Sequence, residues 1–144
     1  MRIMGLDVGS KTIGVAVSDL LGWTAQGVST IQRTTMEVDS REISRLIQEY
    51  EVEKIIVGLP LSMDGIERNQ AVFVRKFVED LQGKIDKIPI ELLDERLSTS
   101  GAERSLLEAD LSREKRKKVI NKMAAVFILQ GYLDAHQGGQ VDPL

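Results

Sequence analysis

The sequence contains no cysteine and has few aromatic residues. Without cysteine the chain has no disulfide framework, no thiolate metal site and no thiol nucleophile, as suits a reducing cytoplasm. Aromatic residues make up 4% of the chain, which is too few for a surface on which single-stranded bases stack. Recognition of a nucleic acid would therefore depend on its shape and backbone.

Long hydrophobic runs are also absent. No stretch approaches the ~20 apolar residues that a membrane-spanning helix needs. The first residues include no uninterrupted apolar region, so we also expect no signal peptide. The chain has 144 residues, 42% of them hydrophobic and 28% charged, which is typical of globular proteins. We expect a cytoplasmic protein with a single domain over residues 1–138 and a short tail over 139–144.

The net charge of −3 conceals a basic segment. Between Arg96 and Lys122 the chain has eight Lys and Arg residues against four Asp and Glu residues. Five of the basic residues are consecutive except for one glutamate: Arg113, Lys115, Arg116, Lys117 and Lys118. Such a run is commonly only the solvated start of a helix, but a basic segment on an acidic protein can also contact phosphates.

The hydrophobic pattern predicts an α/β fold. Strands are expected over 2–8, 12–19, 27–32, 54–60 and 88–96, and helices over 39–50, 68–82, 99–109 and 113–136. Asp39 or Ser40 is expected to cap the first helix. The order βββαβαβα begins with a hairpin and then alternates, which predicts parallel strands joined by crossover helices. We therefore expect a mixed five-stranded sheet with helices on both faces.

Carboxylates occur at two places in this pattern where they need an explanation. Asp7 lies inside the first strand, where aspartate is disfavoured and a buried carboxylate must be paired, hydrogen-bonded or bound to a metal. Asp94 and Glu95 end a later strand, and ligands of α/β proteins gather beyond the carboxyl ends of parallel strands. Oxygen ligands there suit Mg²⁺ or Mn²⁺. The alternative is that Asp7 bonds a turn while Asp94 and Glu95 pair with Arg96.

Four motifs resemble, in order and spacing, the YqgF/RuvX family: "GLDVGSKTIGVAVSD", "GLPLSMDG", "LDERLST" and "AAVFIL". The resemblance implies an RNase H-like fold related to Holliday junction resolvases. It also implies a cytoplasmic bacterial nuclease that matures the 5′ end of pre-16S rRNA, with a structured RNA, free or on the ribosome, as its partner. A nuclease of this kind is a hydrolase that uses paired Mg²⁺ or Mn²⁺ ions for displacement at phosphorus.

The resemblance also implies which residues form the site. Asp7 matches the family's first acidic residue, and Glu95 matches the second better than Asp94 does. The family's third acidic residue falls on Asn121, whose amide oxygen can bind a metal but carries no charge. We therefore expect a weaker metal site or slower chemistry. Asn121 shares a helix face with Ala125 and Ile128, so it is expected to look toward the sheet.

The remaining candidates would bind phosphate. Lys11 follows Asp7 in a turn, and Arg96 follows Glu95; both could contact the substrate backbone, as could the basic run 113–118. The simpler interpretations are a turn lysine and an arginine that steadies the adjacent carboxylates. In "GLPLSMDG", Ser62 and Asp64 are expected only to cap a turn.

Three other functions stay open. Cleavage of branched DNA, such as a Holliday junction, would ordinarily need a symmetric dimer, and the sequence does not distinguish a monomer from a homodimer. Loss of a carboxylate at Asn121 would instead suit a non-catalytic RNA-binding factor for ribosome assembly. The opening motif also resembles the first phosphate loop of the actin and sugar-kinase ATPases, but a chain of 144 residues holds only one lobe of that fold.

Overall fold

The structure is a computed structural model that describes residues 2–61, 69–85, 87–95 and 113–141. In its last helix, the side chains described are those of residues 122–136. The expected helix over 99–109, the loop with Ser62 and Asp64, and Arg96 lie outside the described residues. The elements are β1 (Arg2–Val8), β2 (Thr12–Ser18), β3 (Ala25–Gln32), α1 (Met36–Tyr50), β4 (Val52–Leu59), α2 (Asn69–Gln82), β5 (Ile90–Asp94) and α4 (Arg113–Val141).

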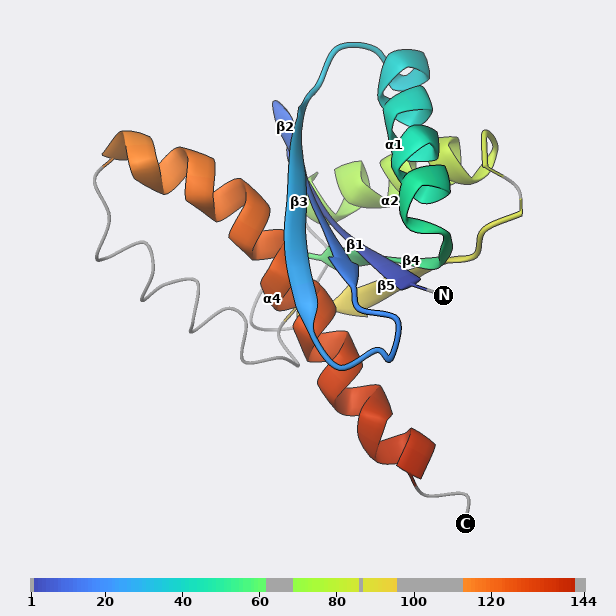
Figure 1. Ribbon diagram of the computed structural model, residues 1–144. Coiled ribbons are helices and arrows are strands. Elements are labelled where there is room, and N and C mark those ends of the chain that lie inside the picture. The colour runs from blue at the N-terminus through green and yellow to red at the C-terminus, as the bar shows by residue number, and fades with distance from the viewer. Residues whose placement is uncertain (1, 62–68, 86, 96–112, 142–144) are drawn as a thin grey trace.

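The strands form one mixed five-stranded sheet, as the sequence predicts, and their order in it is β3-β2-β1-β4-β5 (Figure 1). β1 pairs antiparallel with β2, and β2 pairs antiparallel with β3. β4 pairs parallel with β1, and β5 pairs parallel with β4. The carboxyl ends of β1, β4 and β5 therefore lie at the same edge of the sheet, where a ligand site is expected.

Helices cover both faces of the sheet (Figure 1). On one face, apolar side chains of α1 and α2 pack on a core that includes Met4, Leu6 and Val8 of β1. On the other face, α4 packs on a smaller cluster that includes Ala16 and Ile56. Because side chains alternate along a strand, Ile3, Gly5 and Asp7 face α4.

A glycine lets α4 approach the sheet closely. A β-carbon built on Gly5 would lie 2.7 Å from the Leu129 Cβ and 3.1 Å from the Ala125 carbonyl oxygen. Both contacts involve the helix backbone or its first side-chain atom, so neither can move aside without shifting the helix. Gly5 thus sets the spacing between α4 and β1.

Contacts along α4 show which way it runs over the sheet. Toward its carboxyl end, the Tyr132 hydroxyl accepts a 2.8 Å hydrogen bond from Lys54 Nζ near the start of β4, and this bond raises the pKa of Lys54. One turn earlier, Ile128 packs against Gly58 near the end of β4. The amino-terminal half of α4 therefore leads toward the edge of the sheet where the parallel strands end.

The predicted cap of the first helix was wrong. α1 begins at Met36, and its N-cap is Thr35, whose hydroxyl accepts a 3.2 Å hydrogen bond from the Val38 backbone nitrogen. Asp39 lies inside the first turn and is only 1% exposed, because it turns inward to an ion pair with Arg33. Within the part of the chain described here, no helix is long and apolar enough to cross a membrane.

Candidate active site

Asp7 stands between two glycines on the α4 face of the sheet. Across β2 its partner is Gly14. On its other side, β1 pairs with β4, and Leu6 lies opposite Val57. The next position of β4, beside Asp7, is therefore Gly58. Neither neighbour has a side chain on this face, which allows another group to approach the sheet beside the half-buried Asp7 carboxylate.

Glu95 reaches into this space from the end of β5. One of its carboxylate oxygens, Oε1, lies too close to Gly58 to leave room for a β-carbon there. Gly58 is thus the position that separates Asp7 on β1 from Glu95 after β5, and both carboxylates approach it on the same face. A glycine here is what allows the Glu95 carboxylate to lie over β4.

Asp94 lies on the other face. It pairs with Leu59 as the last residue of β5. Leu92, two residues earlier, packs with the core under α1 and α2, whereas Leu93 packs with the cluster under α4. Alternation therefore places Asp94 with Leu92, away from Asp7. Of the two carboxylates that the sequence offers, Glu95 lies on the same face of the sheet as Asp7 and Asp94 lies on the opposite face.

The position of Asn121 follows from the path of α4. It lies one helical turn before Ala125, which covers Gly5, and α4 runs from there toward the end of β1. The backbone of residue 121 therefore lies on the side of α4 that faces the sheet, near the end of β1 that carries Asp7. The side chains of Asn121 and of the basic run 113–118 are outside the described set, so their roles stay predictions. Among the described residues, no group of three Asp, Glu, His or Cys side chains could hold a metal ion.

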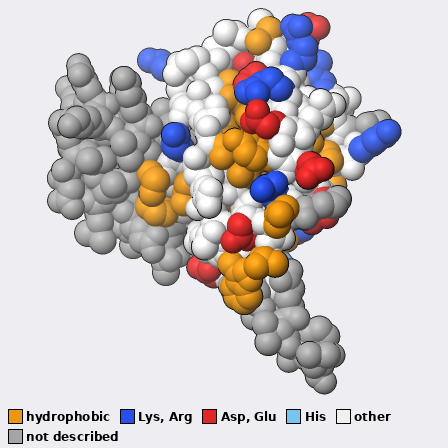
Figure 2. Space-filling view, viewed as in Figure 1, with side chains coloured by type: hydrophobic (Ala, Val, Ile, Leu, Met, Phe, Trp, Pro, Cys, Tyr) orange, Lys and Arg blue, Asp and Glu red, His pale blue; other side chains and the backbone are white. Residues whose placement is uncertain are grey.

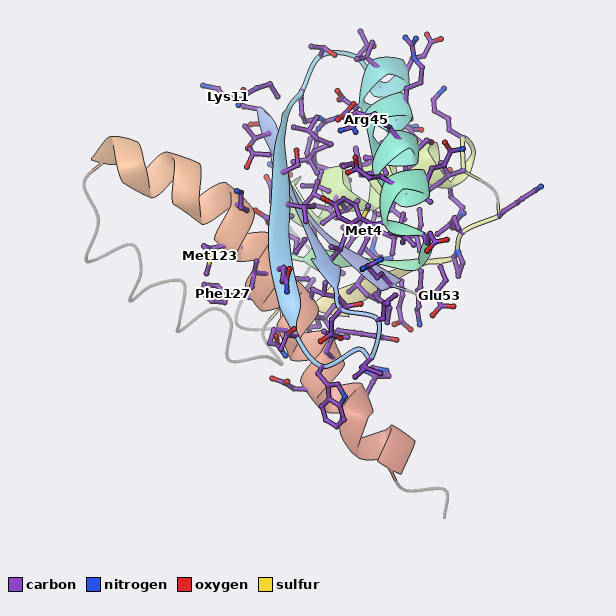
Figure 3. All side chains as sticks on the ribbon, viewed as in Figure 1. Met4, Lys11, Arg45, Glu53, Met123 and Phe127 are labelled. Atoms are coloured by element: carbon purple, nitrogen blue, oxygen red, sulfur yellow. The ribbon has the colours of Figure 1, made fainter. Side chains whose placement is uncertain are left out.

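Lys11 lies in the turn between β1 and β2 and is exposed, pointing away from the sheet (Figure 3). The Gly9 backbone nitrogen donates a 2.9 Å hydrogen bond to the Thr12 carbonyl, which closes the turn. The Lys11 carbonyl accepts a 2.9 Å hydrogen bond from the Arg33 backbone nitrogen. The ammonium group is therefore carried on a fixed backbone beyond the end of β1.

Arg33 holds the same turn from the opposite face, a role that no sequence motif indicates. Its guanidinium donates to the Gly9 carbonyl over 3.1 Å and pairs with Asp39 over 3.4 Å. The guanidinium carbon also lies 5.3 Å and 5.1 Å from the ring centroids of Phe73 and Phe77. Charge, hydrogen bonding and cation–π contact thus tie α1 and α2 to the turn that follows Asp7.

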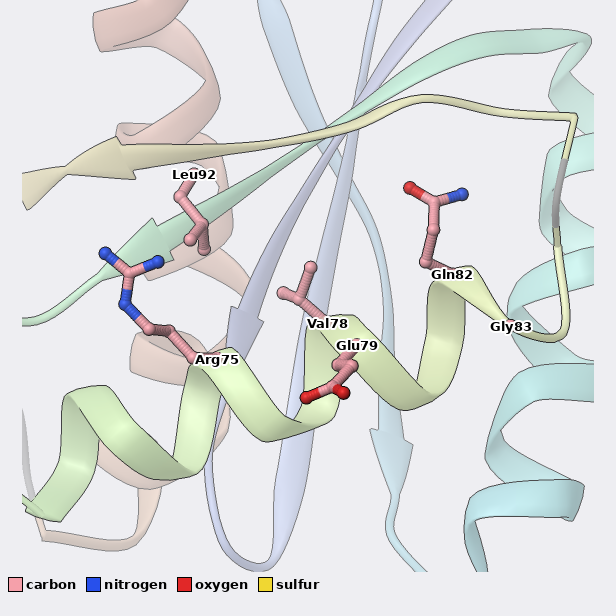
Figure 4. A pocket seen from close by; sticks show the side chains of 6 residues that line it. All are labelled: Arg75, Val78, Glu79, Gln82, Gly83 and Leu92. Atoms are coloured by element: carbon pink, nitrogen blue, oxygen red, sulfur yellow. The ribbon is translucent and has the colours of Figure 1, made fainter.

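A separate cavity lies between α2 and β5. Its volume is about 440 Å³, and it is lined by Arg75, Val78, Glu79, Gln82, Gly83 and Leu92 (Figure 4). Leu92 belongs to the core under α1 and α2, so the cavity opens on the face opposite Asp7 and Glu95. It is not part of the carboxylate site.

Comparison with known proteins identifies the family. The family model described as "RuvX: Holliday junction resolvase" matches residues 1–135. This chain belongs to the RuvX family. The resemblance that the four sequence motifs indicate is therefore confirmed.

Curated RuvX relatives match nearly the whole chain. A protein named "Putative pre-16S rRNA nuclease" from Desulforamulus reducens is 58% identical over 135 residues, which are 94% of this chain and 98% of the relative. A protein of the same name from Myxococcus xanthus is 52% identical over 142 residues, covering 99% of this chain and 93% of the relative. These two proteins and this RuvX chain are thus comparable over nearly their full lengths.

Solved structures confirm the fold. RuvC of Thermus thermophilus, solved in complex with a Holliday junction substrate, matches with a TM-score of 0.58 and 11% identity over 96% of both chains. The yeast mitochondrial Holliday junction resolvase matches with a TM-score of 0.55 and 13% identity, over 97% of this chain and 80% of its own. The RuvX chain therefore has the RNase H-like fold of the RuvC-type resolvases.

Proposed function

We propose that this RuvX chain is a metal-dependent nuclease that trims the 5′ end of pre-16S rRNA in the bacterial cytoplasm. The observation that carries the proposal is the approach of Asp7 and Glu95 to one glycine, Gly58, on the α4 face. The 52–58% identical relatives named for pre-16S rRNA support the choice of substrate.

The residues at the site suit Mg²⁺ or Mn²⁺. Asp7 and Glu95 supply hard oxygen donors, and the glycine at position 58 lets the Glu95 carboxylate approach the face of β4 beside Asp7. Divalent ions bound there would activate a water molecule and stabilise the leaving oxygen at phosphorus. Asp7 and Glu95 would hold the ions, while Asn121 would contribute a neutral amide oxygen as a weak third ligand. Asp94 would take no direct part.

The substrate would be held by the basic side chains near this edge of the sheet. Lys11 extends from the turn after β1, and Arg96 directly follows Glu95. The basic run Arg113, Lys115, Arg116, Lys117 and Lys118 opens α4, whose path leads to the same edge. Phosphate contacts of this kind position a strand without reading its sequence, so RNA structure would select the cleavage point.

The test is cleavage of a labelled pre-16S 5′-leader RNA by purified protein in Mg²⁺ and then in Mn²⁺, with a four-way DNA junction as the second substrate. Asp7→Asn keeps the size of the side chain but removes its charge, and Asp94→Asn makes the same change on the opposite face. We expect cleavage of the RNA by the wild type and by Asp94→Asn, and none by Asp7→Asn. Equal cleavage by Asp7→Asn and the wild type would contradict the proposal.

The same assay separates the alternatives. Cleavage of the DNA junction alone, with a dimer in sedimentation, would identify a resolvase. RNA binding without cleavage in either ion would identify a non-catalytic assembly factor. Because Asp7→Asn is purified in the same way as the wild type, loss of cleavage in that variant alone shows that the activity does not come from a contaminating nuclease.

A further inference from the structure

The turn between β2 and β3 exposes three large apolar side chains. Leu20, Leu21 and Trp23 are 59%, 77% and 52% exposed, and we call these three residues the hairpin tip. Figure 2 shows a group of hydrophobic side chains at the lower edge of the coloured surface, with acidic side chains beside it. Clusters of this kind on a protein surface mark interaction sites more often than single exposed apolar residues do.

The hairpin tip is held in a fixed conformation. The two carboxylate oxygens of Asp19 accept hydrogen bonds from the Trp23 backbone nitrogen over 2.9 Å and from the Thr24 hydroxyl over 3.0 Å. The Gly22 backbone nitrogen donates to the Asp19 carbonyl over 3.2 Å, and Gly22 has a φ of +75°, which favours glycine. A preformed turn loses little conformational entropy when a partner covers it.

α4 fixes the hairpin tip from one side. Gln130 donates a 2.9 Å hydrogen bond to the Trp23 carbonyl and accepts one of 2.9 Å from the Ala25 backbone nitrogen. The same Gln130 amide group donates to the Asp134 carboxylate over 2.9 Å. The hairpin tip therefore lies against Gln130 and Asp134 of α4, and the surface that they form has the carboxylates of Asp19 and Asp134.

Charge indicates what can bind this surface. The sequence has no charged residue between Leu20 and Gln32, and α4 has no Lys or Arg from Met123 to Val141. The charges that hydrogen-bond within the surface, on Asp19 and Asp134, are both negative. RNA phosphates and anionic lipids would be repelled, and a second copy of the same acidic surface would be repelled as well.

We propose that the hairpin tip docks into an apolar pocket on a basic protein of the particle that carries pre-16S rRNA. Trp and Leu side chains would fill the pocket, and Asp19 and Asp134 would meet basic residues around it; buried aromatic anchors dominate the affinity of such interfaces. This proposal rests on the proposed function for its choice of particle. The carboxylate site lies at the other end of the β1–β2 hairpin, so protein and RNA could be bound at the same time.

The test measures binding of Leu21→Ser/Trp23→Ser to small-subunit precursor particles and, separately, to protein-free pre-16S leader RNA. We expect a loss of about ten-fold or more in affinity for the particle and unchanged affinity for the RNA. Val72→Ser, which removes a 59% exposed apolar side chain from α2, should bind both like the wild type. If the double variant does not fold, Leu21→Ser alone replaces it in the test. This variant alters the most exposed of the three side chains and should show a smaller loss of affinity for the particle.

Three outcomes would overturn the proposal. Wild-type affinity of the double variant for the particle would show that nothing docks on the hairpin tip. Loss of affinity for protein-free RNA would show that the surface contacts RNA. If the wild type sediments as a dimer and the double variant sediments as a monomer, the occupant of the hairpin tip is a second copy of this chain. Because binding is measured without cleavage, failure of the nuclease proposal is detected independently, through Asp7→Asn.

Discussion

The Glu95 carboxylate lies over Gly58, so close that a β-carbon at that position would clash with its Oε1 atom. The same β-carbon would come within 2.6 Å of the Ile128 Cδ1 atom on α4. Any side chain at position 58 would therefore displace Glu95 and Ile128 together.

Gly58→Ala tests this arrangement directly. We expect RNA cleavage to be lost, because Glu95 would be moved away from Asp7. The unfolding free energy should fall by only ~1–3 kcal/mol, the usual cost of overpacking, since both displaced groups are the ends of flexible side chains. Cleavage rate and urea unfolding are the measurements. Gly83→Ala is the matched control, because the nearest atom to its β-carbon would be 3.5 Å away.

Glu95→Gln and Asp94→Asn separate two adjacent carboxylates. Glu95 shares a face with Asp7, whereas alternation directs Asp94 to the opposite face. We expect Glu95→Gln to remove metal-dependent cleavage and Asp94→Asn to retain it within a few-fold. Cleavage rates at several Mg²⁺ concentrations measure this. The reverse pattern would mean that Asp94, not Glu95, acts with Asp7.

Asn121→Asp should increase activity. A carboxylate at this position would add a charged oxygen ligand on the helix that covers β1, and the gain in metal-dependent cleavage should be about ten-fold or more. The Mg²⁺ concentration at half-maximal rate should fall as well. Gln48→Glu is the control, because it makes the comparable change from amide to acid at an exposed position of α1, and should not raise the rate. No response to Asn121→Asp would place the third ligand elsewhere.

Arg33→Met leaves the buried carboxylate of Asp39 without its ion-pair partner. Such a loss typically costs ~3–5 kcal/mol, and it would also remove the donor to the Gly9 carbonyl. Chemical unfolding should show a clear loss of stability. Arg33→Met/Asp39→Asn should recover part of it, because the double variant no longer buries an unpaired charge. If the double variant were the sum of the two single losses, the residues would not be coupled.

Acid should loosen the hairpin tip. The hydrogen bond from the Trp23 backbone nitrogen lowers the pKa of Asp19, so the ionised form is favoured in the fold. Its contribution is complete above the unfolded pKa, about 3.9 for an ordinary aspartate, and is lost as the pH falls through the lower folded value. Trp23 is the only tryptophan, so its fluorescence reports on this turn. Emission should change in that acidic range in the wild type, and Asp19→Asn should lack the transition.

The sheet could be predicted because its strands carry a strong pattern. β1 and β2 alternate along one hairpin, and β4 is a short apolar run covered on both faces. The start of α1 was missed because only Met36 of its first turn packs against the core, whereas Val38 is 44% exposed. Helix periodicity becomes visible only at Ile43 and Leu46, which are buried.

The candidate site was only partly predictable for a physical reason. Asp7 is conspicuous because aspartate is unusual inside a strand. The choice between Asp94 and Glu95 was less clear, because Leu92 and Leu93 are both apolar and β5 is covered on both faces. The pattern of apolar and polar residues along β5 therefore does not show on which face of the sheet a given side chain lies. The Arg33–Asp39 pair depends on the packing of α1 and α2, which no short motif encodes.

The β1–β2 hairpin also fixes the distance between the carboxylate site and the hairpin tip. Gly14 lies opposite Asp7, and Asp19, at the base of the hairpin tip, is five residues further along, which is about 17 Å at roughly 3.4 Å per residue. Both strands have a paired strand on each side in the sheet, so this distance stays constant. A particle held at the hairpin tip would thus present its RNA to Asp7 at a constant offset, and the anchoring point would determine which nucleotide becomes the mature end.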